Sequence, residues 1–427
     1  MRKIFYTTML AVLMLCLVTP GLSQNTNPFG NSGSFTGALG LTVIDDQSYL
    51  TINLRPDLAL GKFGIGLNVN LLYNTNSGAI RSEDWDEKYD WARLIRYMRY
   101  GRKGDQFYTK IGTMDAARLG HGFIMNYYTN EASYDERKIG LALDIDFGTF
   151  GFESVTNNLG RLEIIGGRAF VRPLRPYIDV PIIKNLTLGA TFVSDVDPDG
   201  RRGTEDAFNA FGLDVELPII TTSLLRTYTY FDWAKLDTFG TGIAFGVATD
   251  LRLIAGIAEV TARLERRFLG KEFMPAYFDA FYEIQRFQSE TGVRKSESLA
   301  FIQEETRGTF GELVGHILNT VQLVGNYQWL DDPPHYGMLY LAAETKQNVP
   351  MFALQATYNK MGVANMKDAF TLDDRSIARL GIGYKVKPYL VLFMDYIYTF
   401  RFDIEEGRYK SQERYSPRVA FVYNFGF

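Results

Sequence analysis

Residues 414–427, RYSPRVAFVYNFGF, end the chain in a run where every second position from 419 onward is large and apolar. The apolar residues are Val419, Phe421, Tyr423, Phe425 and the last residue, Phe427, and between them stand Ala420, Val422, Asn424 and Gly426. Successive side chains of a β-strand point to opposite faces, so this stretch predicts a strand with one aromatic face and one smaller, more polar face.

The same alternation recurs along the chain, at residues 62–73 (KFGIGLNVNLLY), 138–147, 211–217, 257–268 and 390–402. Aromatic residues make up 14% of the sequence, with 26 Tyr and 31 Phe, and the mean hydropathy is −0.11. After the N-terminal segment, no apolar run reaches the ~18–20 residues that a membrane-spanning helix needs. The chain is therefore expected to be an all-β protein.

Alternation alone also fits a soluble β-sandwich. The segments are, however, long enough to cross a bilayer as tilted strands of ~9–11 residues. Short turns are expected at 61–62, 101–105, 148–149, 250–252, 347–350 and 386–389, and long loops at 74–90, 114–137, 195–206, 361–375 and 403–416. Short periplasmic turns facing long outer loops predict a transmembrane antiparallel up-and-down β-barrel with an even strand number, about 16–20 and best 18–20.

The N-terminus reads as a secretory signal. Arg2 and Lys3 precede an apolar run, and Gly21 and Ser23 fit the positions before a cut at Gln24. We expect residues 1–23 to be cleaved and residues 24–427 to form a single barrel. Cleavage removes Cys16, the only cysteine, so no disulfide or cysteine metal site is expected. The mildly acidic balance argues against a nucleic-acid partner.

The alternation typical of strands is interrupted at residues 288–319. Counting strands from the first one assigns this segment to the periplasmic side. A capping-box pattern at Thr309 and Glu312, with apolar residues at helical spacing after it, predicts a short amphipathic helix near 309–319. Gly308, Gly311 and Gly315 weaken a helix, so an additional strand is the alternative.

At its C-terminus the chain resembles the Gram-negative outer-membrane β-barrels, with a porin-like size. The terminal Phe427, preceded at every second position by Phe425, Tyr423, Phe421 and Val419, is similar to that family's assembly signal. The resemblance implies an outer-membrane location, contact with outer-membrane lipid and recognition by the barrel-assembly machinery. It covers the last strand at motif level and names no solute.

The polar face of the alternating segments carries charges of both signs. Arginine or lysine facing lipid would cost ~2–4 kcal/mol at the bilayer midplane, so these residues are expected to line the lumen. They are Asp144, Asp146, Arg168, Arg172, Asp214, Glu216, Arg226, Asp232, Glu259, Arg263, Glu265, Arg267, Asp279, Glu283, Arg379, Lys385, Asp395 and Arg401. Such charges can select polar solutes, or they can pair with one another and brace the wall.

Two loops stand out. Residues 115–137 are rich in Tyr and apolar residues, which is unusual for a loop in water, and this loop could fold inward and narrow the pore; its His121 is a candidate ligand contact. The second loop, DVDPDGRRGTED at residues 195–206, places Asp195, Asp197, Asp199 and Asp206 in the pattern of a calcium loop. An ordinary acidic turn is the alternative, because Pro198, Arg201 and Arg202 do not suit the cation.

The sequence contains three histidines and no G-x-S-x-G motif, so no enzyme activity is expected. The leading hypothesis is an outer-membrane channel for passive diffusion of small polar solutes. The first alternative is a non-conducting barrel that anchors or scaffolds a cell-surface complex. A weaker alternative, uptake of hydrophobic ligands, conflicts with the charged inner face. Calcium in the outer loop is the only cofactor considered.

Overall fold

The computed structural model describes residues 32–44, 47–81, 85, 91, 94–131, 138–200, 206–253, 258–288, 292–318, 320–331, 337–345, 349–387, 389–403 and 408–426. The expected signal peptide, 1–23, and the terminal Phe427 lie outside these ranges. Among the described residues, no helix is long and apolar enough to cross a lipid bilayer.

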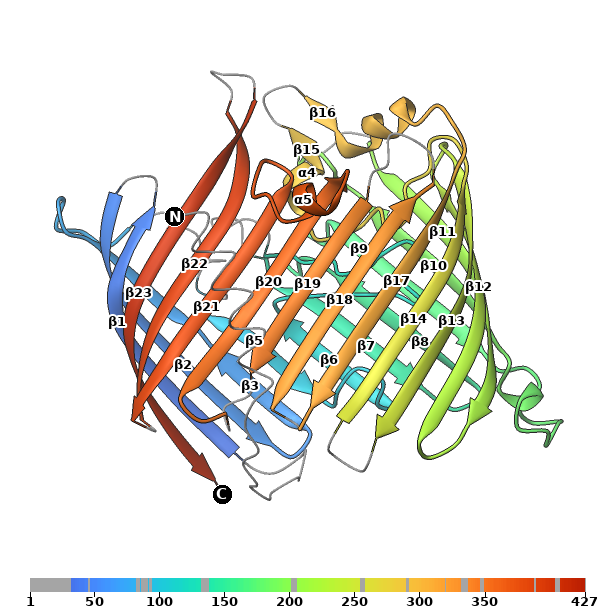
Figure 1. Ribbon diagram of the computed structural model, residues 1–427, viewed down its shortest axis with the longest axis horizontal. Helices are drawn as coiled ribbons and strands as arrows, with labels where there is room; N and C mark the ends of the chain where they lie inside the picture. Colours follow the sequence, from blue (N-terminus) through green and yellow to red (C-terminus); the bar gives the residue numbers. More distant parts are fainter. Residues whose placement is uncertain are drawn as a thin grey trace.

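The chain forms a closed antiparallel β-barrel (Figure 1). The strands of its wall are β1 (Ser32–Ile44), β2 (Gln47–Leu60), β3 (Phe63–Leu67), β4 (Val69–Asn74), β5 (Ile95–Tyr100), β6 (Phe107–Gly112), β7 (Gly140–Asp146), β8 (Phe150–Thr156), β9 (Ile164–Val171), β10 (Thr187–Asp195), β11 (Phe208–Thr221), β12 (Leu225–Leu236), β13 (Thr241–Leu253), β14 (Ala258–Leu269), β17 (Thr306–Ile317), β18 (Val321–Leu330), β19 (Gly337–Thr345), β20 (Phe352–Val363), β21 (Ser376–Lys387), β22 (Leu390–Asp403) and β23 (Arg408–Gly426).

Each strand pairs with the next along the chain, so the topology is up-and-down. β3 and β4 both pair with β2 and form one wall strand that is interrupted at Asn68, so the barrel has 20 strands. The even number and the antiparallel order confirm the fold class expected from the sequence.

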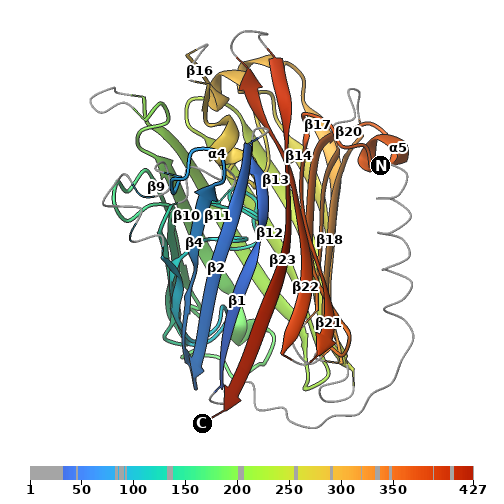
Figure 2. The ribbon, with the colours of Figure 1, turned by 90° about the vertical axis from the view of Figure 1, so that its left-hand side faces the viewer.

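The barrel closes where the first and last strands pair, from Ser32↔Gly426 to Gly40↔Arg418. Figure 2 shows β1 and β23 side by side along this seam. The C-terminal stretch is therefore a wall strand, and its Val419 and Phe421 point outward and are 40% and 58% exposed. Closure matters because an open sheet edge would leave unpaired backbone groups, which a lipid environment cannot satisfy.

Apolar side chains cover the outside of the barrel. Leu213, Phe245, Leu264 and Leu313 are all more than half exposed and stand on β11, β13, β14 and β17. Their sequence neighbours Asp214, Ala244, Glu265 and Glu312 are buried inside. An apolar exterior with a polar interior is the arrangement of a transmembrane barrel.

The connections differ between the two ends of the barrel. The turns at 61–62, 147–149, 222–224 and 318–320 lie at the end where the chain terminates, and the loops at 113–139, 196–207, 270–305 and 364–375 lie at the other. Two expected connections are wrong. Residues 250–252 belong to β13, where Asp250 accepts a hydrogen bond from Thr261 (2.8 Å) inside the barrel. The expected loop at 403–416 is mostly strand, because β23 begins at Arg408.

The prediction of a helix near 309–319 is also wrong, and the alternative prediction of a strand is confirmed. Residues 306–317 form β17, in which Phe310 and Glu312 point inward while Leu313 faces out. The true irregular segment is 270–305, and it lies at the long-loop end rather than on the side of the short turns. It contains α4 (Tyr282–Gln285), the hairpin of β15 (Phe287–Gln288) and β16 (Val293–Arg294), and the 3-10 helix η3 (Lys295–Phe301).

Two further short helices lie outside the wall strands. The 3-10 helix η2 (Ile183–Asn185) precedes β10. Helix α5 (Met366–Ala369) lies in the 364–375 loop, and Asn365 caps it by accepting hydrogen bonds from the backbone N–H groups of Lys367 and Asp368. The same loop encloses Lys360, whose ammonium group donates to Asp373 (2.6 Å).

Candidate functional site: the barrel lumen

Two long loops fold into the barrel instead of standing in solvent. We call residues 113–131 and 138–139, together with 270–288 and 292–305, the lumen insert. Its Met125, Tyr128, Phe278 and Leu299 are fully buried in one apolar cluster with inward side chains of β8 to β14. The sequence left open whether the 115–137 loop folds inward. The described part of that loop does fold into the barrel.

The two parts of the insert are joined by backbone hydrogen bonds. Ala276 N donates to Phe123 O (2.8 Å), Phe278 N to Ile124 O (3.1 Å) and Asn126 N to Phe278 O (3.1 Å). Met125 and Phe278 form a parallel β-bridge. The segments are about 150 residues apart in sequence and behave as one packed unit because buried backbone groups must be paired.

Glycines on the inner wall leave space for side chains of the insert. A Cβ at Gly166, Gly212 or Gly242 would lie 2.8 Å from Leu119, 2.9 Å from Ile124 or 2.3 Å from Phe273, respectively. Real Cβ atoms do not approach other heavy atoms so closely, so a side chain at any of these positions would force the facing residue of the insert to shift.

A buried charged cluster fixes the insert to the wall. Lys138 donates to Glu163 (2.7 Å) and Glu283 (2.8 Å), and Arg286 donates to Glu163 (2.8 Å) and Asp195 (2.7 Å). The side chains of the five residues are at most 12% exposed. Burial alone would raise the pKa of Glu163, but the Lys138 and Arg286 cations outweigh it and lower the pKa to about 2.

A second set of contacts connects His121 to the neighbouring strands β11 and β12 of the wall. Its ring donates from Nδ1 to Asp232 (3.0 Å) and from Nε2 to Glu216 (3.4 Å), and it stacks on Tyr230 with ring centroids 4.0 Å apart. Burial alone would lower the pKa of His121, but the two carboxylates raise it to about 9. His121 is therefore a cation at neutral pH and part of the packing between insert and wall.

Arginine pairs extend this network around the wall. Arg168 donates to both oxygens of Asp214 (2.8 and 2.6 Å) and to Glu153 (2.9 Å). Arg118 of the insert makes a bidentate pair with Glu312, which also accepts from Tyr127 (2.5 Å). These carboxylates are neutralised by cations that reach them from the neighbouring strands and from the insert.

Directly opposed residues of an antiparallel ladder share a face, so the register assigns inward positions from strand to strand. From β7 to β18 the inner face, named here the acidic wall, carries the acids Asp144, Asp146, Glu153, Asp195, Asp214, Glu216, Asp232, Asp250, Glu259, Glu265 and Glu312. Its bases are Arg168, Arg226, Arg252, Arg263, Arg267 and, just beyond β9, Arg172.

The rest of the barrel, β1 to β6 and β19 to β23, has an inner face that we name the basic wall. Among the residues whose side chains the structure describes, its bases are Arg55, Arg96, Arg99, Lys110, Arg379, Lys385, Arg414 and Arg418. Its acids are Asp57, Glu344 and Asp395. Asp57 pairs with Arg96, and Asp395 pairs with Arg418.

The lumen positions expected on strands fall on one of these two faces, whereas Asp279 and Glu283 belong to the insert. For Arg401 this rests on the backbone register alone, opposite Lys410, because its side chain is not described. Sequence reasoning did not select Glu153 and Glu312, although the strand alternation could have found them. Arg118, Glu163 and Arg286 stand on loops, where no periodic signal marks an inward side chain.

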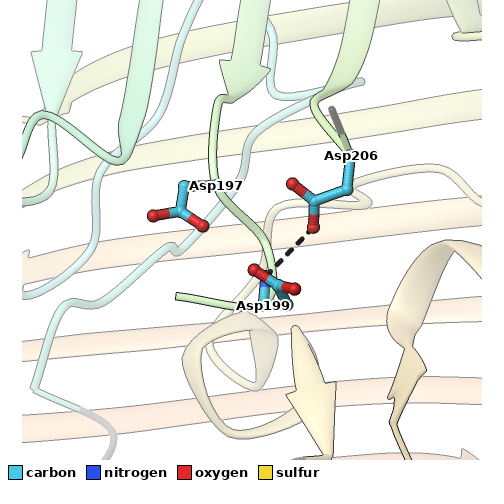
Figure 3. A group of neighbouring side chains, drawn as sticks. All are labelled: Asp197, Asp199 and Asp206. Carbon is cyan, nitrogen blue, oxygen red and sulfur yellow. Dashed lines mark hydrogen bonds between the residues drawn. The ribbon is translucent and has the colours of Figure 1, made fainter. Parts of the chain in front are cut away.

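Three of the four candidate calcium ligands come together. Asp197, Asp199 and Asp206 each offer a carboxylate oxygen within 4.8 Å of the others, and Asp199 N donates to Asp206 (3.3 Å; Figure 3). Asp195 does not join them, because its carboxylate accepts from Arg286 and Tyr282 inside the lumen (2.7 and 2.8 Å). Arg161 also pairs with Asp197 (3.2 Å).

No family model and no curated protein match this sequence. Solved structures with distant similarity include OpdK from Pseudomonas aeruginosa, an outer membrane protein, at 10% identity and a TM-score of 0.33, covering 92% of this chain and 99% of that one. OccK9 (OpdG) from the same organism has 13% identity and a TM-score of 0.34, with 93% and 98% covered. CdiB from Acinetobacter baumannii has 8% identity and a TM-score of 0.28; the match covers 92% of this chain and 60% of CdiB.

These similarities are too distant to carry an inference about ligand or activity. The closed wall, the apolar exterior and the charged lumen of the chain itself define its class. It is a transmembrane β-barrel of porin-like architecture, with part of its lumen filled by its own loops.

Proposed function

We propose that the protein is a channel in the outer membrane of a Gram-negative bacterium and passes small polar solutes by diffusion. The observation that supports this most directly is the uneven filling of the lumen. The insert buries the central part of the acidic wall, where the side chains of Asp214, Glu265 and Glu312 are at most 4% exposed, whereas Asp146 and Arg226 near the short turns are 36% and 50% exposed. On the basic wall, Arg96 and Arg379 keep 37% of their side chains exposed.

The space between the insert and β17 to β20 is too small to be the passage. The cavity there, lined by Tyr127, Asn326, Gln328 and Tyr340 among others, has a volume of about 40 Å³. That is room for a few water molecules at most. We place the route for solute along the basic wall, where Arg96 and Arg379 are partly exposed.

Planar-bilayer recording of the purified full-length protein tests the proposal. We expect stable single-channel steps, and we expect liposomes that carry the protein to swell in small sugars. A barrel that is folded, as judged by its heat-modifiable electrophoretic mobility, but gives neither steps nor swelling would overturn the channel function. We expect no catalytic activity, and lipid and the assembly machinery to be the partners during biogenesis.

A non-conducting anchor for a surface complex is the second candidate. The feature that favours it is η3 of the long-loop end, whose Phe301 is 85% exposed. Large exposed aromatic residues are common anchors in protein interfaces. This function predicts a stoichiometric partner that is lost on Phe301→Ser, together with a silent bilayer recording.

We also propose that the loop carrying Asp197, Asp199 and Asp206 binds Ca²⁺, because carboxylate oxygens at this spacing suit a hard cation. Calcium titration calorimetry on the full chain tests it. Asp199→Asn should abolish the binding heat, whereas Asp179→Asn, an exposed acid near η2, should leave it unchanged. Equal heats for the three proteins would show that the cluster is an ordinary acidic turn.

A further inference from the structure

The charges of the lumen are divided between its two walls. Acids outnumber bases on the acidic wall, and bases outnumber acids on the basic wall. A neutral lumen with scattered pairs would not produce this division. The side of the lumen that carries more acids is also the side on which the insert packs.

The insert supplies the acidic wall with cations of its own. Arg118 pairs with Glu312, His121 with Asp232, and Arg286 with Asp195. The carboxylates are thus both covered and neutralised, and they contribute little to the potential that a solute meets. Unpaired carboxylates buried in this way would cost several kcal/mol each, which explains why the insert carries the matching charges.

The basic wall keeps its charge excess, and Arg96 and Arg379 keep 37% of their side chains exposed, whereas Arg418 and Lys110 keep 10% and 17%. Its basic residues are spread over the height of the barrel: Arg379 stands near the long-loop end of β21, Arg418 in the middle of β23, and Arg99 and Lys385 near the short turns. The insert touches this wall at several places: Tyr127 stacks on Tyr340, Arg379 donates to Glu131 O, Asp115 pairs with Lys110 (2.7 Å) and Phe281 packs against Phe400. Even there, Arg379 stays 37% exposed.

A narrow passage with one sign of charge along a low-dielectric wall concentrates ions of the opposite sign. We propose that the solutes of this channel are small anions, and that they cross along the basic wall from Arg379 to Lys385. This inference rests on the proposed channel function and adds the charge class and the route of its solutes.

Reversal potentials in a KCl gradient across a planar bilayer test the inference on the unmodified full chain. We expect chloride to permeate roughly tenfold better than potassium, the lower end of the enrichment that such fields produce. Equal permeabilities, or a preference for potassium, would overturn the anion inference and leave the channel function intact. A folded barrel without conductance would instead remove the channel function itself.

Variants locate the route. The double variant Arg99→Gln with Lys385→Gln removes two charges from the basic wall at the short-turn end, and we expect the chloride preference to fall to less than about half. Arg252→Gln removes one positive charge near the same end of the acidic wall and serves as the control. If Arg252→Gln lowers the preference as much as the double variant does, the solutes do not follow the basic wall. Both readouts are ratios, so a lower yield of folded protein does not affect them.

Discussion

At the scale of single residues, the lumen is organised by side chains that satisfy one another. His121 is the clearest case, because its ring is held between Asp232, Glu216 and Tyr230. A lone histidine in a loop gives no such signal in the sequence. The two carboxylates raise its pKa to about 9, so its charge is a structural feature at neutral pH.

We predict that His121 stabilises the barrel below pH 9 and ceases to do so above it. The pKa is higher in the folded state than the ~6.5 of a free histidine, so the contribution is fully present below pH ~6.5 and is lost as the pH rises through about 9. His121→Gln should lower the thermal unfolding midpoint in detergent at pH 6 and leave it nearly unchanged at pH 10. An equal loss at both values would mean that the ring contributes by packing rather than by charge.

A substitution at Gly242 tests whether the insert needs close packing against the inner wall. A Cβ there would lie 2.3 Å from the Phe273 ring, and Gly242→Val should therefore push the insert from the wall and destabilise the protein by about 1–3 kcal/mol. Gly311→Val on β17 is the control, because a Cβ at Gly311 meets nothing within 4 Å. The measurement is proteolysis within 270–288, which should become faster for the first variant alone. The same rate of proteolysis for both variants would argue against close packing of the insert at Gly242.

At the scale of elements, the strands were largely predictable and the insert was not. Alternation identified the inward Asp214 and Arg263 correctly because each strand has one face in lipid and one in the lumen. The same rule failed at β17, where the Thr309 and Glu312 pattern suggested a helix cap. In the structure Glu312 instead pairs with Arg118 and Arg263, contacts across almost 200 and about 50 residues that no local pattern reveals.

The 115–137 loop gave a partial signal, its aromatic content, but its depth in the lumen depends on glycines and on the 270–305 segment far away in sequence. Tyr128, for example, is buried because its hydroxyl reaches Glu283, which itself stands on α4. The candidate calcium loop shows the same limit. Its spacing fits four carboxylates, yet Asp195 is drawn into the barrel by Arg286.

We predict that Arg286 is the main attachment of the insert. Arg286→Met leaves Glu163, Asp195 and Glu283 buried with less compensation, which should cost about 3–5 kcal/mol. The unfolding midpoint should fall and the insert should become accessible to protease. Arg294→Gln breaks an exposed pair with Glu297 and is the matched control, with an expected change near zero. If the two variants behave alike, the buried cluster does not hold the insert.

At the scale of the whole molecule, the barrel and its insert form two complementary charge systems. The insert covers and neutralises carboxylates of the acidic wall, and the proposed anion path follows the basic wall. The wall itself closes through the backbone pairing of β1 with β23, which involves no residue of the insert. Removal of the insert should therefore change the permeation properties before it destroys the fold.

This leads to a test on the full barrel in which residues 270–305 are replaced by a short Gly/Ser turn that joins β14 directly to β17. These two strands already pair from Leu269↔Thr306, so a tight connection fits their geometry. The change removes Arg286 and uncovers acidic-wall carboxylates that include Asp195. We expect larger single-channel conductance and a shift of the reversal potential toward potassium, because the widened lumen then exposes carboxylates along with the basic wall. A folded deletion variant with unchanged conductance and unchanged chloride preference would show that the insert does not limit the path.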